Sequence, residues 1–353
     1  MRKSILFSAA LAAGAGLVSS SGAVAQDASD ALRAFLDTRD IPVTVDNFVR
    51  AATDIEFGKY LALSGGVNQL FHVRTPTLIE QQPTIRMNRD TLYSMAVIDI
   101  SEGATLTLPD TGDRYISAQV VNQDHYMNEV FLGGGDHALT LEIFETPFVL
   151  VIIRTLVDAS DPEDLDKVHA IQDQISIAAG SARPFIVPDY DDRSFEDVLE
   201  AAKGLARFIP DSRLTFGPSD TVDPVRHMLG AAFGWGGLPE DQAFYLTVEP
   251  GLPVGVYKIE VPPDVPVGAF WSVSLYNADG YYEKNPLAAY NINLVMGARN
   301  EDGSMTVHLG DCDDGRVNCL PITEGWNYTV RLYRPGAEIL DGSWSFPEVE
   351  PAG

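Results

Sequence analysis

Residues 91–100, TLYSMAVIDI, and residues 148–157, FVLVIIRTLV, decide the fold, because both are runs of β-branched and other apolar side chains. Runs of this composition between turn residues are typical of buried strands. Three further runs of the same kind lie between them, at residues 105–108, 114–131 and 138–144. Several consecutive strands of this kind predict a β-sandwich or barrel.

Helical patterns precede and follow these strands. Asp46 is placed to cap a helix whose apolar side chains recur at helical spacing, and Gly65 and Gly66 end it. After the strands, Ser160 and Glu163 have the spacing of a capping box. Two more helices are predicted, one from residue 194 onward and one at about 224–233, the latter ending in a glycine-rich segment, residues 234–237.

A second group of predicted strands begins at residue 244. Its runs are residues 244–248, 255–261, 270–277, 292–296, 305–309 and 328–333. Asn277 to Gly280 has the composition of a hairpin turn. We therefore expect a mainly β protein with helical segments, in which two sandwich-like or barrel-like domains, residues 26–158 and 238–353, are joined by a helical connector, residues 159–237.

The first residues have the features of a secretory signal peptide. Arg2 and Lys3 precede an apolar run at residues 5–18, and Ala23-Val24-Ala25 supplies a signal peptidase site. We expect residues 1–25 to be removed, Gln26 to become the N-terminus, and the protein to be periplasmic or secreted. The apolar run is too short to cross roughly 30 Å of hydrocarbon, so no membrane span is expected.

The net charge of the chain limits the classes of binding partner. The chain has a formal net charge of −26, which repels phosphate backbones, so we expect no nucleic-acid partner. Its hydrophobic fraction of 45% argues against disorder. Oligomeric state is not predicted by these features.

The two cysteines, Cys312 and Cys319, lie in a turn-rich segment of a chain predicted to be exported. A disulfide between them is the expectation in an oxidising compartment. A calcium loop is the alternative, but the acidic residues miss the required spacing by one position.

Several motifs resemble a known pair of domains. Residues 88–94, NRDTLYS, followed by 108–110 and 114–115, resemble domain of unknown function 1254. Residues 270–277, FWSVSLYN, with 302–304, 318–321 and 330–335, resemble its usual partner, domain of unknown function 1214. The resemblance implies two β-rich domains in an exported bacterial protein and no established chemistry. Cys319 stands where the family usually has tryptophan, which suggests that the disulfide replaces the packing of that ring.

Asp90 and Tyr93 are the first candidate catalytic residues, because Asp90 lies at the edge of an apolar strand and needs a polar partner there. It either pairs with Arg89 or caps a turn, or it activates a water while Tyr93 donates to an oxyanion. Arg89 is a candidate ligand-binding residue. Signatures of common hydrolases, zinc proteases, nucleotide-binding proteins and thioredoxin-like proteins are missing from the sequence.

A polar stripe is predicted along the strand at residues 114–131. If side chains alternate through this strand, one face carries Asn122, Asp124, Tyr126 and Asn128, and His125 lies on the other. The stripe is either a ligand-binding surface or a solvated face. Asp124 and His125 are further catalytic candidates. Adjacent residues on a strand point in opposite directions, so the pair does not favour a metal site.

The second domain concentrates aromatic and amide side chains near its hairpin. Trp271, Tyr276 and Asn277 are candidate ligand-binding residues, because aromatic rings and amides together are what carbohydrate sites use. The same residues are also ordinary core and turn residues.

Three functions are compatible with these features, none requiring a cofactor. The first is metal-independent hydrolysis of a small ester, phosphoester or glycoside at Asp90, Tyr93, Asp124 and His125. The second is non-catalytic binding of a carbohydrate or another envelope ligand. The third is a structural role in the envelope. Convergence of the four catalytic candidates on one pocket would favour the first.

Overall fold

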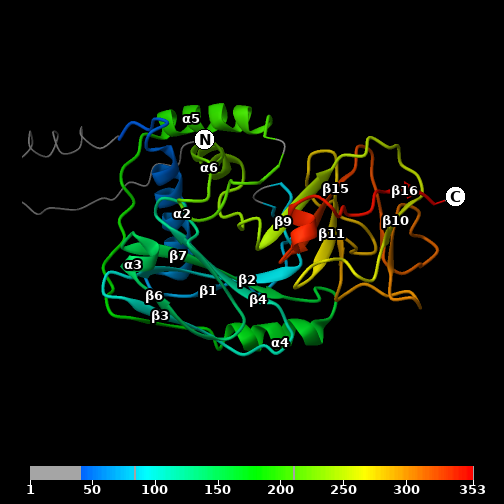
Figure 1. The fold of residues 1–353 in the computed structure, drawn as a ribbon, viewed down its shortest axis with the longest axis horizontal. Helices are drawn as coiled ribbons and strands as arrows, with labels where there is room; N and C mark the ends of the chain where they lie inside the picture. Colours follow the sequence, from blue (N-terminus) through cyan, green and yellow to red (C-terminus); the bar gives the residue numbers. More distant parts are fainter. Residues whose placement is uncertain (1–40, 83–84, 210, 353) are drawn as a thin grey trace, which may run out of the picture.

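A computed structural model describes residues 41–82, 85–209 and 211–352 of the chain (Figure 1). The predicted signal peptide and Gln26 lie outside these residues. The described part is mainly β, as predicted, with strands arranged in four sheets. No helix within it combines the length and hydropathy of a membrane-spanning helix.

The N-terminal unit is built on a five-stranded antiparallel sheet. The two runs that suggested the fold are its neighbouring strands β2 and β7, paired from Thr91 opposite Leu156 to Asp99 opposite Phe148. In sheet order the strands are β1 (Phe71–His72), β2 (Thr91–Asp99), β7 (Phe148–Leu156), β4 (Ile116–Asn122) and β5 (Glu129–Leu132).

Each face of this sheet buries a different apolar layer. One face, with Ile98, Ala118 and Val151, packs on a smaller sheet, in the order β6 (Gly135–Leu139), β3 (Ala104–Leu108) and β8 (Ser176–Ala179). The other face, with Val97 and Leu150, packs against helix α2 (Phe48–Ser64). Figure 1 shows α2 on one side of the sheet and β3, β6 and helix α4 (Pro162–Gln172) on the other.

The helices form near their predicted positions but begin at different caps. Asn47, and not Asp46, precedes α2, which ends at Gly65 in a left-handed conformation. Asp161, and not Ser160, caps α4, because its carboxylate accepts a hydrogen bond from the Glu163 N–H. The predicted capping box is therefore wrong: the Ser160 hydroxyl bonds to Asp158 instead.

The segment predicted as a helical connector packs onto the N-terminal unit. Besides α4 it contains α5 (Asp192–Ala206), α6 (Pro224–Phe233) and strand β8, which pairs with β3. Ala202 of α5 and Leu229 of α6 lie in one apolar cluster with Phe48 of α2. Residues 176–179 thus contribute a strand to the smaller sheet, and the predicted domain boundaries stay a prediction.

The predicted strand over residues 114–131 is wrong. It is interrupted after Asn122 by a turn in which His125 has a φ of 64°. The N–H of His125 donates to the Asn122 carbonyl, which closes the turn. Strand alternation therefore fails, and the polar stripe predicted from it does not form. The run at 138–144 also divides, into β6 and the short helix α3 (Leu141–Phe144).

The C-terminal unit is a sandwich of two four-stranded sheets around one apolar core, which includes Trp271, Val273 and Leu332. One sheet has the order β12 (Asn291–Asn293), β11 (Trp271–Tyr276), β15 (Asn327–Tyr333) and β9 (Ala243–Val248). The other has the order β14 (Cys319–Leu320), β13 (Met305–Leu309), β10 (Tyr257–Val261) and β16 (Glu350–Pro351), and helix α7 (Ala337–Leu340) follows β15. Cys312 and Cys319 form the predicted disulfide.

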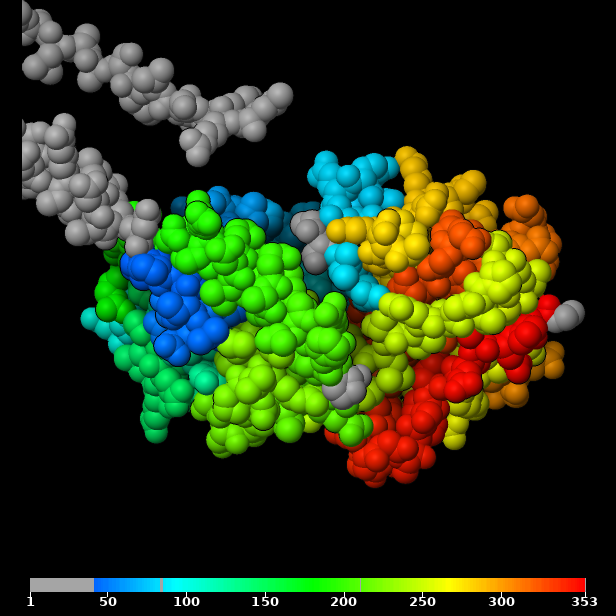
Figure 2. All heavy atoms as spheres, turned by 90° about the horizontal axis from the view of Figure 1, so that it is seen from above, coloured from blue at the N-terminus to red at the C-terminus, as the bar shows by residue number. Residues whose placement is uncertain are grey.

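The face of β11 and β15 that points away from this core is polar and buried. It carries Ser272, Ser274 and Arg331, with relative exposures of 4% or less. The segment at residues 85–93 of the N-terminal unit covers it: the Arg86 N–H donates to the Gly280 carbonyl. Figure 2 shows cyan atoms of this part of the chain against gold atoms of the C-terminal unit.

Candidate functional site

Asp90 is the centre of the contact between the two units. Its side chain is fully buried and accepts three hydrogen bonds from the C-terminal unit. One oxygen accepts from the Ser272 hydroxyl at 2.6 Å, and the other from the amides of Asn291 at 2.7 Å and Asn293 at 3.2 Å. Its backbone N–H donates to the Asn88 side chain. The polar partner that the sequence required is therefore supplied by the other unit, and not by Arg89.

Arg331 lies beside this carboxylate on β15, where it is the strand partner of Ser272. Its guanidinium is buried and well supplied with acceptors. These acceptors are the hydroxyls of Ser274 and Tyr276 and the carbonyls of Arg86 and Met87. Arg331 thus holds residues 86 and 87 on the sheet.

Asn88 joins Tyr93 of the N-terminal unit to Tyr333 of the C-terminal unit. Its amide donates to the Tyr93 hydroxyl at 3.3 Å and to the Tyr333 hydroxyl at 3.0 Å. Tyr93 is only partly buried, whereas Tyr333 has a relative exposure of 1%. The candidate residues Asp90 and Tyr93 are therefore brought near one another through Asn88, but no hydrogen bond joins their side chains in the described residues.

Arg154 is a buried cation on the same side of the sheet as Tyr93, its strand partner. The guanidinium carbon is 5.4 Å from the centre of the Tyr93 ring. The guanidinium donates to the Gln119 side chain at 2.7 Å and to the Gly236 carbonyl at 3.2 Å. Within the described part of the chain, Arg154 forms no salt bridge, so no carboxylate oxygen lies within 4.0 Å of its guanidinium.

Five tyrosines from both units lie close enough to Arg154 to interact with its charge: Tyr60, Tyr93, Tyr115, Tyr245 and Tyr333. Burial raises the pKa of Tyr60 and of Tyr115 to about 12. Burial also raises the pKa of Tyr245, and raises that of Tyr333 well above its ordinary value. The four phenols with raised pKa values are therefore neutral at pH 7 and can donate hydrogen bonds.

Asp124 and His125 lie elsewhere and point apart. Asp124 is partly exposed and forms a salt bridge with Arg50. His125 is fully buried, its ring stacks on Trp235, and burial holds its pKa well below the ordinary value. Its Nε2 accepts a hydrogen bond from the Gly236 N–H, and the Gly236 carbonyl accepts one from Arg154, so Gly236 links the two side chains.

The other residues of the predicted stripe hold the turn around His125. The Asn122 side chain accepts from the N–H groups of Asp124 and Tyr126. The amide of Asn128 donates to the Ile143 carbonyl, and Tyr126 stacks on His227 with ring centres 4.4 Å apart. These contacts are those of a structured turn.

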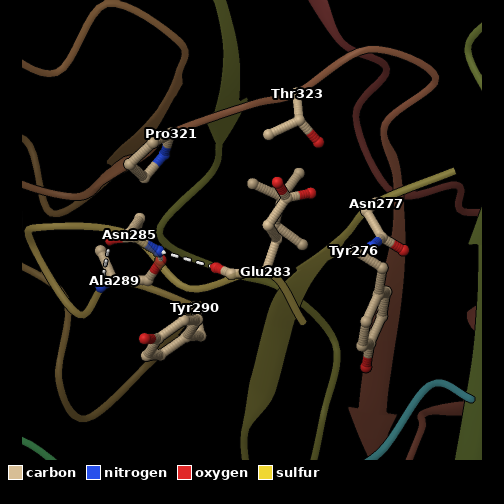
Figure 3. A pocket seen from close by; sticks show the side chains of 9 residues that line it. Tyr276, Asn277, Glu283, Asn285, Ala289, Tyr290, Pro321 and Thr323 are labelled. Atoms are coloured by element: carbon tan, nitrogen blue, oxygen red, sulfur yellow. Dashed lines mark hydrogen bonds between the residues drawn. The ribbon is translucent and has the colours of Figure 1, made fainter. Parts of the chain in front are cut away.

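Trp271 is a core residue with a relative exposure of 2%, packed against Phe346. Tyr276 and Asn277 instead line a small hollow on the C-terminal unit, shown in Figure 3 with Glu283, Asn285 and Tyr290. Its cavity volume is about 10 Å³, which is about the space that one water molecule needs. A sugar ring does not fit this hollow as it stands.

Arg89 lies between the units near that hollow. It donates to the Thr77 carbonyl and lies over the Tyr290 ring at 4.9 Å, while its Nε has no partner within the described chain. Burial lowers its pKa. Its contacts are with a carbonyl and a ring, and not with Asp90.

A larger hollow, of about 340 Å³, lies between the end of α2 and residues 182–185. Its wall is apolar except for Arg183, whose guanidinium pairs with the buried Asp99. The Ser101 hydroxyl and the Arg183 backbone N–H help to lower the pKa of Asp99 to about 2 against the opposing effect of burial. Arg183 is thus engaged in holding a structural carboxylate.

Sequence reasoning missed Arg154, Ser272, Asn291, Arg331 and Tyr333. One signal was available for Arg154, since it is the only charged residue in the apolar run at 148–157. A charge in a buried strand requires a partner. The partners of Asp90 carry no such local signal.

The fold and these contacts define a protein of two β-rich units that meet through a buried polar interface. Residues 67–138 match the family described as protein of unknown function DUF1254, and residues 252–337 match protein of unknown function DUF1214. The two matches lie in the N-terminal to C-terminal order that the motifs indicated.

A solved structure shares this fold. The VPA0106 protein from Vibrio parahaemolyticus is 18% identical, with a TM-score of 0.65 over 88% of this chain and 98% of that chain. An uncharacterised protein from Burkholderia cenocepacia is 14% identical, with a TM-score of 0.49 over 94% of this chain and 97% of that chain. A comparison with curated proteins finds no match.

Proposed function

We propose that this chain binds a small molecule between its two units, at the cluster formed by Arg154 with Tyr93, Tyr115, Tyr245 and Tyr333. The supporting observation is a set of buried polar groups without partners. In the described chain, the hydroxyls of Tyr115 and Ser117 are neighbours of one another and have no other hydrogen-bond partner, and Arg154 uses only two of its N–H groups. Native proteins satisfy almost all such groups, so a ligand is a natural partner for them.

The position of the cluster also favours a ligand. Small-molecule sites are common at the interfaces between domains. The cluster takes side chains from β2, β7 and the residue before β4 on one wall and from β9 and β15 on the other. Tyr93 and Tyr245 are only partly buried, which gives the cluster contact with solvent.

A screen of small metabolites by thermal unfolding, followed by hydrogen exchange, tests this proposal. A stabilising compound should slow amide exchange in peptides from both walls, residues 88–93, 115–119 and 243–247. Peptides from β10 and β13, in the far sheet of the C-terminal unit, are the control and should not change. Protection confined to residues 276–290 would place the site at the hollow of Figure 3 and contradict the proposal.

Hydrolysis of a small ester, phosphoester or glycoside is the second candidate. The observation in its favour is the Tyr93 phenol beside the Arg154 guanidinium, because two such groups can stabilise an oxyanion. Asp90 would then have to act as the base, although three donors already hold its two oxygens.

We further propose that the protein acts outside the cytoplasm after loss of residues 1–25. The sequence of those residues supports export, and a disulfide is typical of an oxidising compartment. The intact mass of protein recovered from the periplasm or the medium should correspond to a chain that begins at Gln26. A mass that includes Met1 to Ala25 would refute cleavage.

A further inference from the structure

The polar groups around Arg154 are donors that lack an acceptor. The hydroxyls of Tyr93 and Tyr333 accept hydrogen bonds from Asn88, but neither has an acceptor for its own proton within the described chain. The buried Tyr115 hydroxyl has only the Ser117 hydroxyl as a neighbour there, and no carbonyl or carboxylate acceptor. Other tyrosine hydroxyls at the interface do have an acceptor: those of Tyr276 and Tyr282 both donate to the Met87 carbonyl at 2.8 Å.

The buried charges at the interface are also out of balance, with more cations than carboxylates. Asp90 is one buried carboxylate, and Arg331 and Arg154 are two buried cations. Arg331 is within the electrostatic influence of Asp90 and has four acceptors. Arg154 has two neutral acceptors and no carboxylate within 4.0 Å among the described residues. A buried charge without a counter-ion is costly, so Arg154 requires an anion.

We infer that Arg154 is the counter-ion of a small organic carboxylate bound between the two units. The carboxylate oxygens accept hydrogen bonds from the free N–H groups of the guanidinium and from the phenols of Tyr93, Tyr115 and Tyr333. This inference rests on the proposed function and names the class of its ligand.

The charge and the surroundings both favour a carboxylate over a phosphate. Among the buried side chains of the interface the excess is one positive charge, which a carboxylate balances, whereas a phosphate ester carries about −1.5 to −2 at pH 7. The partly buried Arg89 lies over the Tyr290 ring and is not counted. Guanidinium and carboxylate also match as a bidentate pair. Aromatic rings complete the wall: Phe270 stacks on Tyr333 with ring centres 4.1 Å apart and meets the edge of Tyr115. Such a wall accommodates the apolar body of an organic acid.

Matched acids and amides test the inference on the full-length oxidised protein. Acetate and benzoate are the anionic probes, acetamide and benzamide are their neutral isosteres, and inorganic phosphate is the alternative anion. Calorimetric titration should show at least one carboxylate binding about tenfold or more tightly than its amide, which corresponds to about 1.4 kcal/mol. Arg154→Gln should reduce the affinity of that acid to the affinity of its amide.

Two further variants and a control guard against misfolding. Tyr115→Phe and Tyr93→Phe keep the charge and the ring but remove one donor, and each should weaken the acid several-fold and leave the amide unchanged. Arg207→Gln removes an exposed guanidinium of the connector and should change nothing. If Arg154→Gln does not fold, these two tyrosine variants decide the question.

Several outcomes would overturn the inference. They are equal binding of acid and amide, preferential binding of phosphate, no binding of any carboxylate in the millimolar range, and acid binding unchanged in Arg154→Gln. The proposed site is judged separately by hydrogen exchange. Amides that protect both walls would keep the site and remove only its anionic character, whereas acids that protect other peptides would remove both.

Discussion

Asp90 accepts a 2.6 Å hydrogen bond from the hydroxyl of Ser272, although 182 residues separate the two in sequence. The pair joins the residue that precedes β2 in the N-terminal unit to the polar face of β11 in the C-terminal unit. With Asn291 and Asn293 it gives a fully buried carboxylate three neutral donors. A buried carboxylate needs hydrogen-bond donors, and here the other unit supplies them, so Asp90 holds the two units together.

Asp90→Asn should lower the free energy of unfolding by roughly 1–3 kcal/mol, because it replaces a buried acceptor with a group that also carries donors. Urea unfolding measures this change. Asp113→Asn, at an exposed position, is the matched control and should change stability little. If Asp90→Asn and Tyr93→Phe instead abolish a hydrolytic activity while stability is unchanged, the result supports the hydrolase hypothesis and contradicts a purely structural role of Asp90 at the interface.

Gly237→Ala should destabilise the protein by about 1–3 kcal/mol, as overpacked core positions do. An added Cβ at Gly237 would be 2.5 Å from the ring of Phe216, and the same residue accepts a hydrogen bond from Gln119. Gly204→Ala in α5 is the control: its Cβ meets nothing within 4 Å, so it should stabilise by about 0.4–1 kcal/mol. Thermal unfolding measures the stability of both variants, and equal changes in stability would contradict the prediction.

The stability should fall as the pH falls below about 6.5. Burial lowers the pKa of His125 and of His227 in the folded protein, so the unfolded chain binds protons in a range where the folded chain does not. Stability from these groups is present above the unfolded pKa and is lost toward the folded pKa. Protonation would also remove the acceptor that His125 offers to the Gly236 N–H.

Urea unfolding at several pH values between 5 and 8 checks this expectation. His125→Gln keeps an acceptor but cannot titrate, so it should flatten the pH dependence while it lowers stability at pH 8 through altered packing. A free energy of unfolding that is constant over this range would show that neither histidine is linked to folding.

Thiol titration of the denatured, unreduced protein should find no free thiol, because Cys312 and Cys319 are bridged. Reduction, or the double change Cys312→Ala and Cys319→Ala, should cost about 2 kcal/mol, since the bridge closes a short loop. The circular dichroism spectrum should be retained. Two titratable thiols would contradict the bridge.

Local patterns predicted most of the secondary structure. The runs at 91–100 and 148–157 became β2 and β7, and the predicted turn at residues 277–280 forms with Gly280 at a φ of 85°. The failures occurred where a side chain competes for the backbone. Asn122 accepts from two N–H groups and ends a strand that looked continuous, and Asp161 displaces Ser160 as a cap.

The candidate site was less accessible to sequence reasoning. Asp90 could be singled out because a carboxylate beside a buried strand needs a partner, but Ser272, Asn291 and Asn293 become its partners only through the docking of two sheets. Arg154 is marked by its apolar neighbours, whereas the tyrosines around it are common residues in strands. Convergence in space is a property of the tertiary fold and leaves no mark in local spacing.

The covering of the polar face by residues 85–93 has a consequence for the order of assembly. Synthesis proceeds from the N-terminus, and N-terminal units generally fold first. The covering segment therefore leaves the ribosome long before Asn291 and Asn293, which must reach Asp90. Until β12 and β15 exist, this carboxylate stays hydrated, and its desolvation is among the last steps by which the nascent chain closes.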